Sequence, residues 1–118
     1  MIVPSTVVDK PWGYELIWAR TDRYVGKLLH VRAGEALSLQ YHRVKDETIM
    51  VVSGRVQLVY FVDGEPPRSR DLAPREPFHV TPGMRHRIIA IEDSDLLEVS
   101  TAELEDVVRL EDRYGRVK

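Results

Sequence analysis

The sequence predicts an all-β fold, either a sandwich or a barrel. Many short runs are rich in Val, Ile, Leu and Tyr, and turn residues separate them at close spacing. No long stretch shows the period of 3.6 residues that marks an amphipathic helix. Short strands at this spacing are typical of sandwiches and barrels.

The strands are expected in eight places along the chain. These are residues 15–19, 24–31, 36–42, 47–53, 56–62, 78–80, 85–91 and 96–101. Ser53-Gly54 lies between two apolar runs and predicts a tight hairpin, because glycine adopts a positive φ at low cost. Residues 63–69 are expected to form an exposed loop. One helical turn is expected over residues 101–106.

The composition fits a single domain over residues 1–118. The chain is 43% hydrophobic and 31% charged, which excludes intrinsic disorder. Seventeen basic and nineteen acidic residues give a net charge of −2, which argues against general nucleic-acid binding. The chain has no cysteine, so disulfides, thiolate metal sites and a cysteine nucleophile are excluded. No signal peptide or membrane span is evident, and we expect a cytoplasmic protein.

Two polar residues are predicted to point into an apolar interior. Glu47 shares its strand face with Ile49 and Val51, and His86 lies on an equally apolar face of residues 85–91. A lone carboxylate is costly to bury. A divalent cation solves the problem, because it compensates the carboxylate and accepts a lone pair from the imidazole.

Gln40 and His42 complete the predicted metal site. They are two residues apart, which places both side chains on one face of a strand. Gln40, His42, Glu47 and His86 together offer amide oxygen, imidazole nitrogen and carboxylate donors. These suit one divalent ion, Zn, Fe, Mn, Co or Ni.

The spacing of these residues resembles the sequence motifs of the cupin family. Gly34, Gln40, His42, Glu47 and Gly54 match the first motif, G-x5-H-x-H-x4-E-x6-G, with Gln in place of the first His. Gly83 and His86 resemble the core of the second motif. The resemblance implies a single cupin domain, a jelly-roll barrel also called a double-stranded β-helix.

Four ordered blocks narrow the resemblance. Residues 10–13, 37–40, 51–54 and 108–116 are similar to successive blocks of the type II phosphomannose isomerase domain, which also forms the C-terminal part of bifunctional mannose-1-phosphate guanylyltransferases. That family implies a Gln-His-Glu-His metal set holding zinc. This chain departs from it at residues 43–46, which are Arg-Val-Lys-Asp where the family carries His-His-Arg-Ala.

The resemblance implies mannose-6-phosphate isomerase-like chemistry, with the metal polarising the sugar oxygens. Glu98 shares a face with Leu96 and matches a glutamate of the family, so it is the predicted general base between C1 and C2. A carboxylate satisfied by a neighbouring strand is the equally weighted alternative. Five basic residues are candidates for holding the phosphate: Arg43, Lys45, Arg85, Arg87 and Arg109.

The sequence leaves open whether the chain is an enzyme. The alternatives are a non-catalytic metal- or sugar-binding cupin and a quercetinase-like metal dioxygenase. A dioxygenase predicts an apolar, aromatic-lined pocket, whereas an isomerase predicts a polar and basic one. We also expect a homodimer, because exposed sheet edges need covering. Trp12 is expected to cover a barrel opening or a dimer seam.

Overall fold

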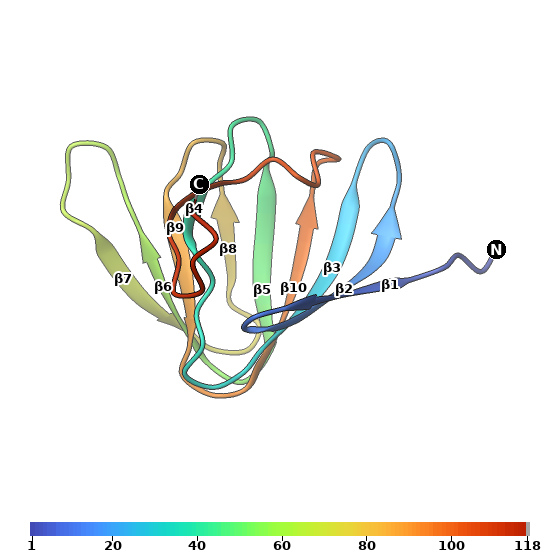
Figure 1. Ribbon diagram of the computed structural model, residues 1–118, viewed down its shortest axis with the longest axis horizontal. Coiled ribbons are helices and arrows are strands. Elements are labelled where there is room, and N and C mark those ends of the chain that lie inside the picture. Colours follow the sequence, from blue (N-terminus) through green and yellow to red (C-terminus); the bar gives the residue numbers. More distant parts are fainter. Residues whose placement is uncertain (118) are drawn as a thin grey trace.

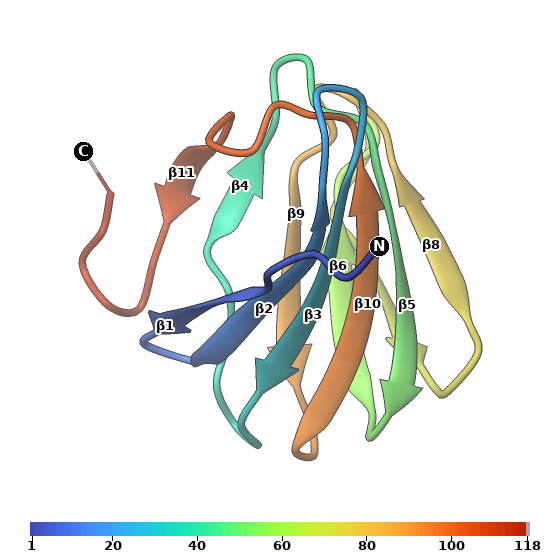
Figure 2. The same cartoon turned by 90° about the vertical axis from the view of Figure 1, so that its right-hand side faces the viewer.

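Two antiparallel sheets face each other in the computed structural model, which describes residues 1–117 (Figure 1). The strands are β1 (Thr6–Lys10), β2 (Gly13–Arg20), β3 (Val25–Val31), β4 (Leu39–Tyr41), β5 (Glu47–Ser53), β6 (Val56–Tyr60), β7 (Arg68–Leu72), β8 (Pro77–Val80), β9 (His86–Ala90), β10 (Ser94–Ser100) and β11 (Val108–Glu111). One sheet has the order β1-β2-β3-β10-β5-β8 and the other β11-β4-β9-β6-β7. Figure 2 shows β10 and β5 in front of β9 and β6. The predicted all-β jelly-roll is confirmed.

Alternate residues of the strands point into the space between the sheets. In β5, Glu47, Ile49 and Val51 are buried, whereas Thr48 and Met50 between them are half-buried. This period of two is that of a pleated strand with one face on the core. The core cluster consists of Trp12, Leu29, Val31, Ile49, Val51, Val56, Leu58, Leu72, Ile88, Ala90 and Leu96.

The tight turn expected at Ser53-Gly54 is present, but the expected hairpin is wrong, because β5 and β6 lie in different sheets and do not pair. Gly54 has a φ of 86°, in the left-handed region that favours glycine. A Cβ at this position would lie 2.3 Å from the backbone oxygen of Asp93. The turn therefore needs glycine for its conformation and for the close approach of the segment at Asp93 and Ser94.

The helical turn expected over residues 101–106 is wrong, because the segment is irregular. Thr101 does not cap a helix, since its hydroxyl accepts a hydrogen bond from the backbone N–H of Asp46 (3.0 Å). The carboxylate of Asp106 accepts hydrogen bonds from the backbone N–H groups of residues 43–45. Over residues 1–117 the chain forms no helix, and so none long enough to cross a membrane.

The turn between β1 and β2 closes one side of the space between the sheets. Trp12 is 2% exposed and belongs to the core cluster. Arg32 holds the turn in place: its backbone N–H donates to the oxygen of Trp12 (3.0 Å), and its Nη2 donates to the oxygen of Pro11 (2.7 Å). A Cβ at Gly13 would lie 1.8 Å from the backbone oxygen of His30. Of the two roles expected for Trp12, the structure supports the cover of an opening.

Candidate metal centre and its cavity

Three buried side chains converge at one end of the space between the sheets. His42 follows β4, Glu47 begins β5 and His86 begins β9. All three are at most 4% exposed, and one ligand atom from each lies within 4.8 Å of the others. Oε1 of Glu47 is 3.2 Å from Nε2 of His42 and 3.5 Å from Nε2 of His86. The predicted inward orientation of Glu47 and His86 is confirmed, and His42 is buried beside them.

Backbone contacts fix which nitrogen of each imidazole faces this cluster. His42 Nδ1–H donates to the backbone oxygen of Asp106 (2.6 Å), and His86 Nδ1–H donates to that of Met84 (2.9 Å). Because a carbonyl only accepts, the lone pair of each neutral ring lies on Nε2. Two Nε2 atoms and a carboxylate oxygen thus point at one another, and they need positive charge between them. Either a proton on Nε2, which then donates to Glu47, or a metal ion that accepts the nitrogen lone pairs supplies it.

The second oxygen of Glu47 points to Lys45. Oε2 lies 3.1 Å from Lys45 Nζ, but it is buried and makes no hydrogen bond of good geometry within residues 1–117. Burial alone would raise the pKa of Glu47, but hydrogen bonds from His42 and His86 and the charge of Lys45 hold it well below its usual range. The carboxylate is therefore charged, and it keeps acceptor capacity for a cation. The donor set fits a divalent transition metal.

Gln40 lies beside this cluster. It pairs directly with His86 across β4 and β9 and lines the cavity described below. Its Oε1 accepts a hydrogen bond from Ser38 Oγ (2.8 Å). An amide oxygen has two lone pairs, so one remains for a metal ion. The role of Gln40 as a fourth ligand stays a prediction.

Glu98 and Lys45 form a buried ion pair next to the three ligand candidates. Lys45 Nζ lies 3.1 Å from Glu98 Oε2 as well as from Glu47. Burial opposes the charge of Lys45, but Glu98 and Glu47 outweigh it, so its pKa is raised. Burial and the charge of Glu47 raise the pKa of Glu98 to about 7, against the opposing effect of Lys45 and Lys27. The predicted inward orientation of Glu98 is confirmed.

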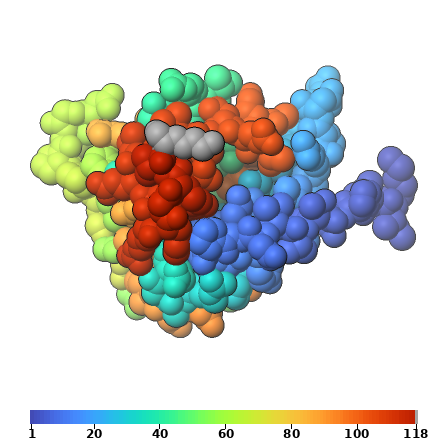
Figure 3. Space-filling view, in the orientation of Figure 1, coloured from blue at the N-terminus to red at the C-terminus, as the bar shows by residue number. Residues whose placement is uncertain are grey.

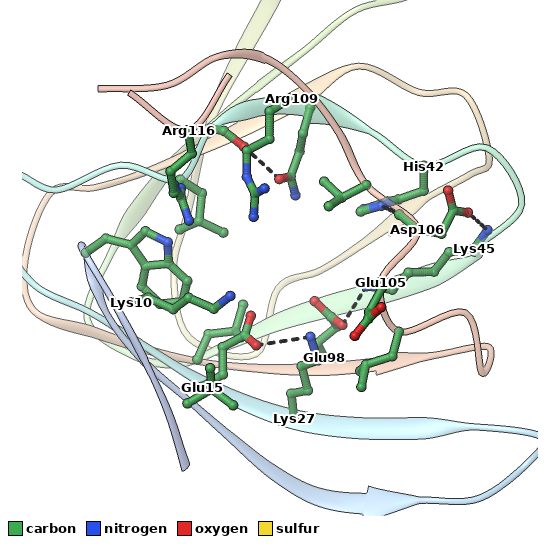
Figure 4. Close-up of a pocket in the computed structure, with 18 of the residues that line it drawn as sticks. Lys10, Glu15, Lys27, His42, Lys45, Glu98, Glu105, Asp106, Arg109 and Arg116 are labelled. Atoms are coloured by element: carbon green, nitrogen blue, oxygen red, sulfur yellow. Dashed lines mark hydrogen bonds and ion pairs between the residues drawn. The ribbon is translucent and has the colours of Figure 1, made fainter. Parts of the chain in front are cut away.

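A cavity of about 390 Å³ opens beside this cluster (Figure 4). Gln40, His42, Lys45 and Glu98 line it, whereas Glu47 and His86 lie behind its lining. Nine charged residues line it: Lys10, Glu15, Lys27, Lys45, Glu98, Glu105, Asp106, Arg109 and Arg116. The sequence analysis named Lys45, Glu98 and Arg109 but not the other six. Alternation of inward and outward residues along β3 would have identified Lys27, because it lies between the buried Val25 and Leu29 on the inward face.

Three of the five residues predicted to hold phosphate are not among those that line the cavity. Arg43 lies over the ring of Tyr41, and Arg85 lies 4.6 Å from the ring centre of Phe61. Arg87 Nε donates to the backbone oxygen of Leu37 (3.1 Å). A role for these three in phosphate binding stays a prediction, without support from their position.

Asp106 organises the loop that carries His42 and Lys45. Its carboxylate accepts hydrogen bonds from the backbone N–H groups of Arg43 (3.1 Å), Val44 (2.8 Å) and Lys45 (2.9 Å). These three bonds hold its pKa at about 2. The backbone oxygen of Asp106 also accepts a hydrogen bond from His42 Nδ1–H. Asp106 therefore fixes both the imidazole and the loop that follows it. The sequence analysis did not identify this residue.

Residues 3–112 match the family described as Mannose-6-phosphate isomerase C-terminal. The chain belongs to this family. It is 38% identical to the mannose-1-phosphate guanylyltransferase of Escherichia coli K12, over 93% of this chain and 23% of that protein. It is 31% identical to the mannose-1-phosphate guanylyltransferase of Salmonella montevideo, over 92% of this chain and 23% of that protein. The chain thus spans about a quarter of the length of these relatives.

Solved structures share the fold at low sequence identity. The capsular polysaccharide assembling protein CapF from Staphylococcus aureus aligns with a TM-score of 0.75 and 19% identity, over 92% of this chain and 35% of that one. An oxalate decarboxylase aligns with a TM-score of 0.77 and 19% identity, over 89% and 30%. KdgF from Halomonas aligns with a TM-score of 0.71 and 22% identity, over 83% and 88%. The fold is that of the cupins.

Proposed function

We propose that this chain is a metal-dependent isomerase that interconverts the aldose and ketose forms of a hexose phosphate. One observation carries the proposal: the buried carboxyl group of Glu98 lines the same cavity as His42, and Lys45 joins it to Glu47 with 3.1 Å contacts to both carboxylates. Membership of a family named for mannose-6-phosphate isomerase supports the substrate class.

The metal would be held by His42, Glu47 and His86, with Gln40 as a fourth donor. Zinc accepts this mixture of nitrogen and oxygen donors, and so does manganese. Mn(II) centres occur in the oxalate decarboxylase of Bacillus subtilis, which has the same fold. The ion would supply Lewis-acid polarisation of the sugar's carbonyl and hydroxyl oxygens.

Glu98 would move the proton. Its carboxylate takes the proton from C2 of the aldose, and the electron pair of that C–H bond forms a double bond between C1 and C2. The protonated Glu98 then returns the proton to C1, while a proton moves from the oxygen on C2 to the oxygen on C1. A pKa of about 7 suits both steps near neutral pH, because the group accepts and releases a proton with little driving force. Lys45 holds Glu98 Oε2 at 3.1 Å and orients it.

The cavity lining supports an isomerase over a dioxygenase. Five of the lining residues are basic and four are acidic, and Trp12 is the one Trp, Tyr or Phe in the lining. A polar, basic pocket is what the isomerase predicted, because a sugar phosphate is hydroxylated and anionic. A non-catalytic sugar-binding cupin would have the same kind of pocket, so only a measurement of turnover distinguishes it from an isomerase.

Solvent exchange tests the proposal. Metal-loaded protein is incubated with mannose 6-phosphate in deuterated water, and the recovered sugar is analysed by NMR. We expect deuterium at C2, with the signal lost in Glu98→Gln while the metal stays bound. If no hexose phosphate takes up deuterium, the chain is a binding protein. Uptake that survives Glu98→Gln keeps the isomerase and removes Glu98 as its base.

The homodimer also belongs to the proposal. Strands β1 and β8 end the larger sheet, and β11 and β7 end the smaller one. Their free backbone groups favour pairing with another chain. Light scattering on the purified protein distinguishes a monomer from a dimer.

A further inference from the structure

The charges that line the cavity are unequally matched. Lys27 Nζ lies 3.3 Å from Glu15 Oε1, and Lys45 pairs with Glu98 and Glu47. These pairs account for two of the five cations that line the cavity. A third, Arg116, forms two contacts with Asp112, at 2.9 and 3.0 Å.

Lys10 and Arg109 remain without an acidic partner. Neither makes a salt bridge or a side-chain hydrogen bond within residues 1–117, and Nε of Arg109 is fully buried with no acceptor. A buried donor left without a partner is costly, and an anion entering the cavity would satisfy it. The two cations come from the two chain ends that close the cavity, β1 and β11.

The position of these residues relative to the metal ligands is set by the sheets. Arg109 pairs directly with Gln40, which pairs in turn with His86, so the three lie in one row across β11, β4 and β9. Lys10 reaches the cavity from the opposite sheet. Figure 4 shows Lys10 and Arg109 directed into the cavity from two sides, with His42 and Lys45 at the far end. In Figure 3 the N-terminal hairpin (blue) and the C-terminal segment (red) adjoin on the same face.

We infer that Lys10 and Arg109 form the phosphoryl subsite of this cavity, with Arg116 beside them. The inference rests on the proposed function, since it assigns the phosphate end of the sugar to this side and the reacting carbons to the side of Glu98. The fork of Arg109 binds two phosphate oxygens, and Lys10 supplies a compact charge. Glu98, which pairs with Lys45 at the far end of the cavity, disfavours the reverse orientation.

Binding measurements on the metal-loaded protein test the subsite without requiring turnover. Isothermal titration is carried out with mannose 6-phosphate and with inorganic phosphate as separate probes. Arg109→Gln and Lys10→Met should each weaken mannose 6-phosphate binding about 10-fold or more, as expected for a lost charge-assisted contact. Arg55→Gln is the matched control, because Arg55 pairs with Asp71 outside the cavity, and its affinity should equal that of the wild type.

A variant of the metal cluster tests where the phosphate binds. His86→Ala removes a metal ligand and should keep the binding of inorganic phosphate, because the subsite lies on Lys10 and Arg109. Loss of that binding in His86→Ala would place phosphate on the ion and overturn the inference. Unchanged affinity in both Arg109→Gln and Lys10→Met would also overturn it. If Arg109→Gln does not fold, Lys10→Met decides alone, because Lys10 lies on the half-exposed hairpin.

Failure of this inference is distinguishable from failure of the proposed function. Without deuterium exchange, a 10-fold loss of phosphate binding in the variants would leave the subsite intact in a non-catalytic protein. If deuterium exchange occurs but both variants bind mannose 6-phosphate as tightly as the wild type, the proposed isomerase stands and the assignment of the phosphate to Lys10 and Arg109 is wrong.

Discussion

The two ends of the barrel are built from the same strands and differ in what those strands carry. Strand β5 has Glu47 inward at one end and Val51 at the other, and β9 changes from His86 to Ala90. All four are buried. Strands β5 and β9 both run from the end that is uppermost in Figure 2 to the lower end, so Glu47 and His86 lie at the upper end and Val51 and Ala90 lie toward the lower one. We call these the polar end and the apolar end.

The comparison shows that burial serves two purposes in this fold. At the apolar end it stabilises the protein, because hydrocarbon is removed from water at about 25 cal/mol for each Å². At the polar end it costs free energy, and each charge needs a partner of opposite sign. Substitutions at the apolar end should therefore act on stability alone, whereas those at the polar end should act on metal and ligand binding as well.

Leu58→Ala should have the largest effect on stability. Leu58 is fully buried in the core cluster, so truncation removes hydrophobic contacts and leaves a cavity, at a cost of about 2–5 kcal/mol. Urea unfolding with and without a chelator should give the same loss. Val52→Ala is the control, because Val52 is 46% exposed and should change stability by no more than about 0.5 kcal/mol. A loss for Leu58→Ala that depends on metal would contradict the separation of the two ends.

Lys45→Met should have an effect that depends on metal. Without metal, it leaves the buried carboxylates Glu47 and Glu98 without their shared cation, which costs about 3 kcal/mol. Zinc in excess should restore part of the loss, because it compensates Glu47. The control Arg55→Met breaks an exposed pair and should cost less than about 1 kcal/mol. Equal losses in the two variants would show that the pairs of the polar end are not distinct from surface pairs.

Asp106→Asn should have a smaller effect, confined to a pH window. The pKa of Asp106 is depressed to about 2 in the folded protein, so its contribution to stability is present above its unfolded value. That contribution is lost as the pH falls through about 2. The wild type should thus be the more stable protein at pH 7, and the difference in urea midpoint should vanish at the acidic end. A difference that stays constant down to pH 2 would show that the carboxylate charge is not what holds the loop.

Central strands were predictable from the sequence, whereas of the four edge strands only β8 was predicted. Strands β3, β5, β9 and β10 alternate between an apolar core face and a more polar face, or are apolar throughout. The three strands that the prediction omitted, β1, β7 and β11, all lie at a sheet edge. In β7 four of the five residues are exposed, so no alternation marks it, and part of it had been assigned to a loop. Charged edge strands resist pairing with other chains, which removes the apolar pattern that prediction depends on.

The site was predictable where a polar residue interrupts an apolar face. Glu47, His86 and Glu98 were each found by this argument, and all three are buried. Arg109 was named as a phosphate candidate from its charge, and Lys10 was not named. Neither interrupts an apolar strand face, because the turn after β1 and the pairing of β11 bring them to the cavity from the chain ends. Asp106 acts through backbone N–H groups, and no residue pattern marks such contacts.

Metal content is the most direct test of the polar end as a metal site. Protein purified without a metal-affinity step is incubated in turn with Zn, Mn, Fe, Co and Ni, desalted and analysed by mass spectrometry for bound metal. The account predicts close to one ion per chain in the wild type and in His79→Ala, whose histidine is exposed and pairs with Asp46. His42→Ala and His86→Ala should lose it. A wild-type protein that stays empty with all five metals would contradict the account.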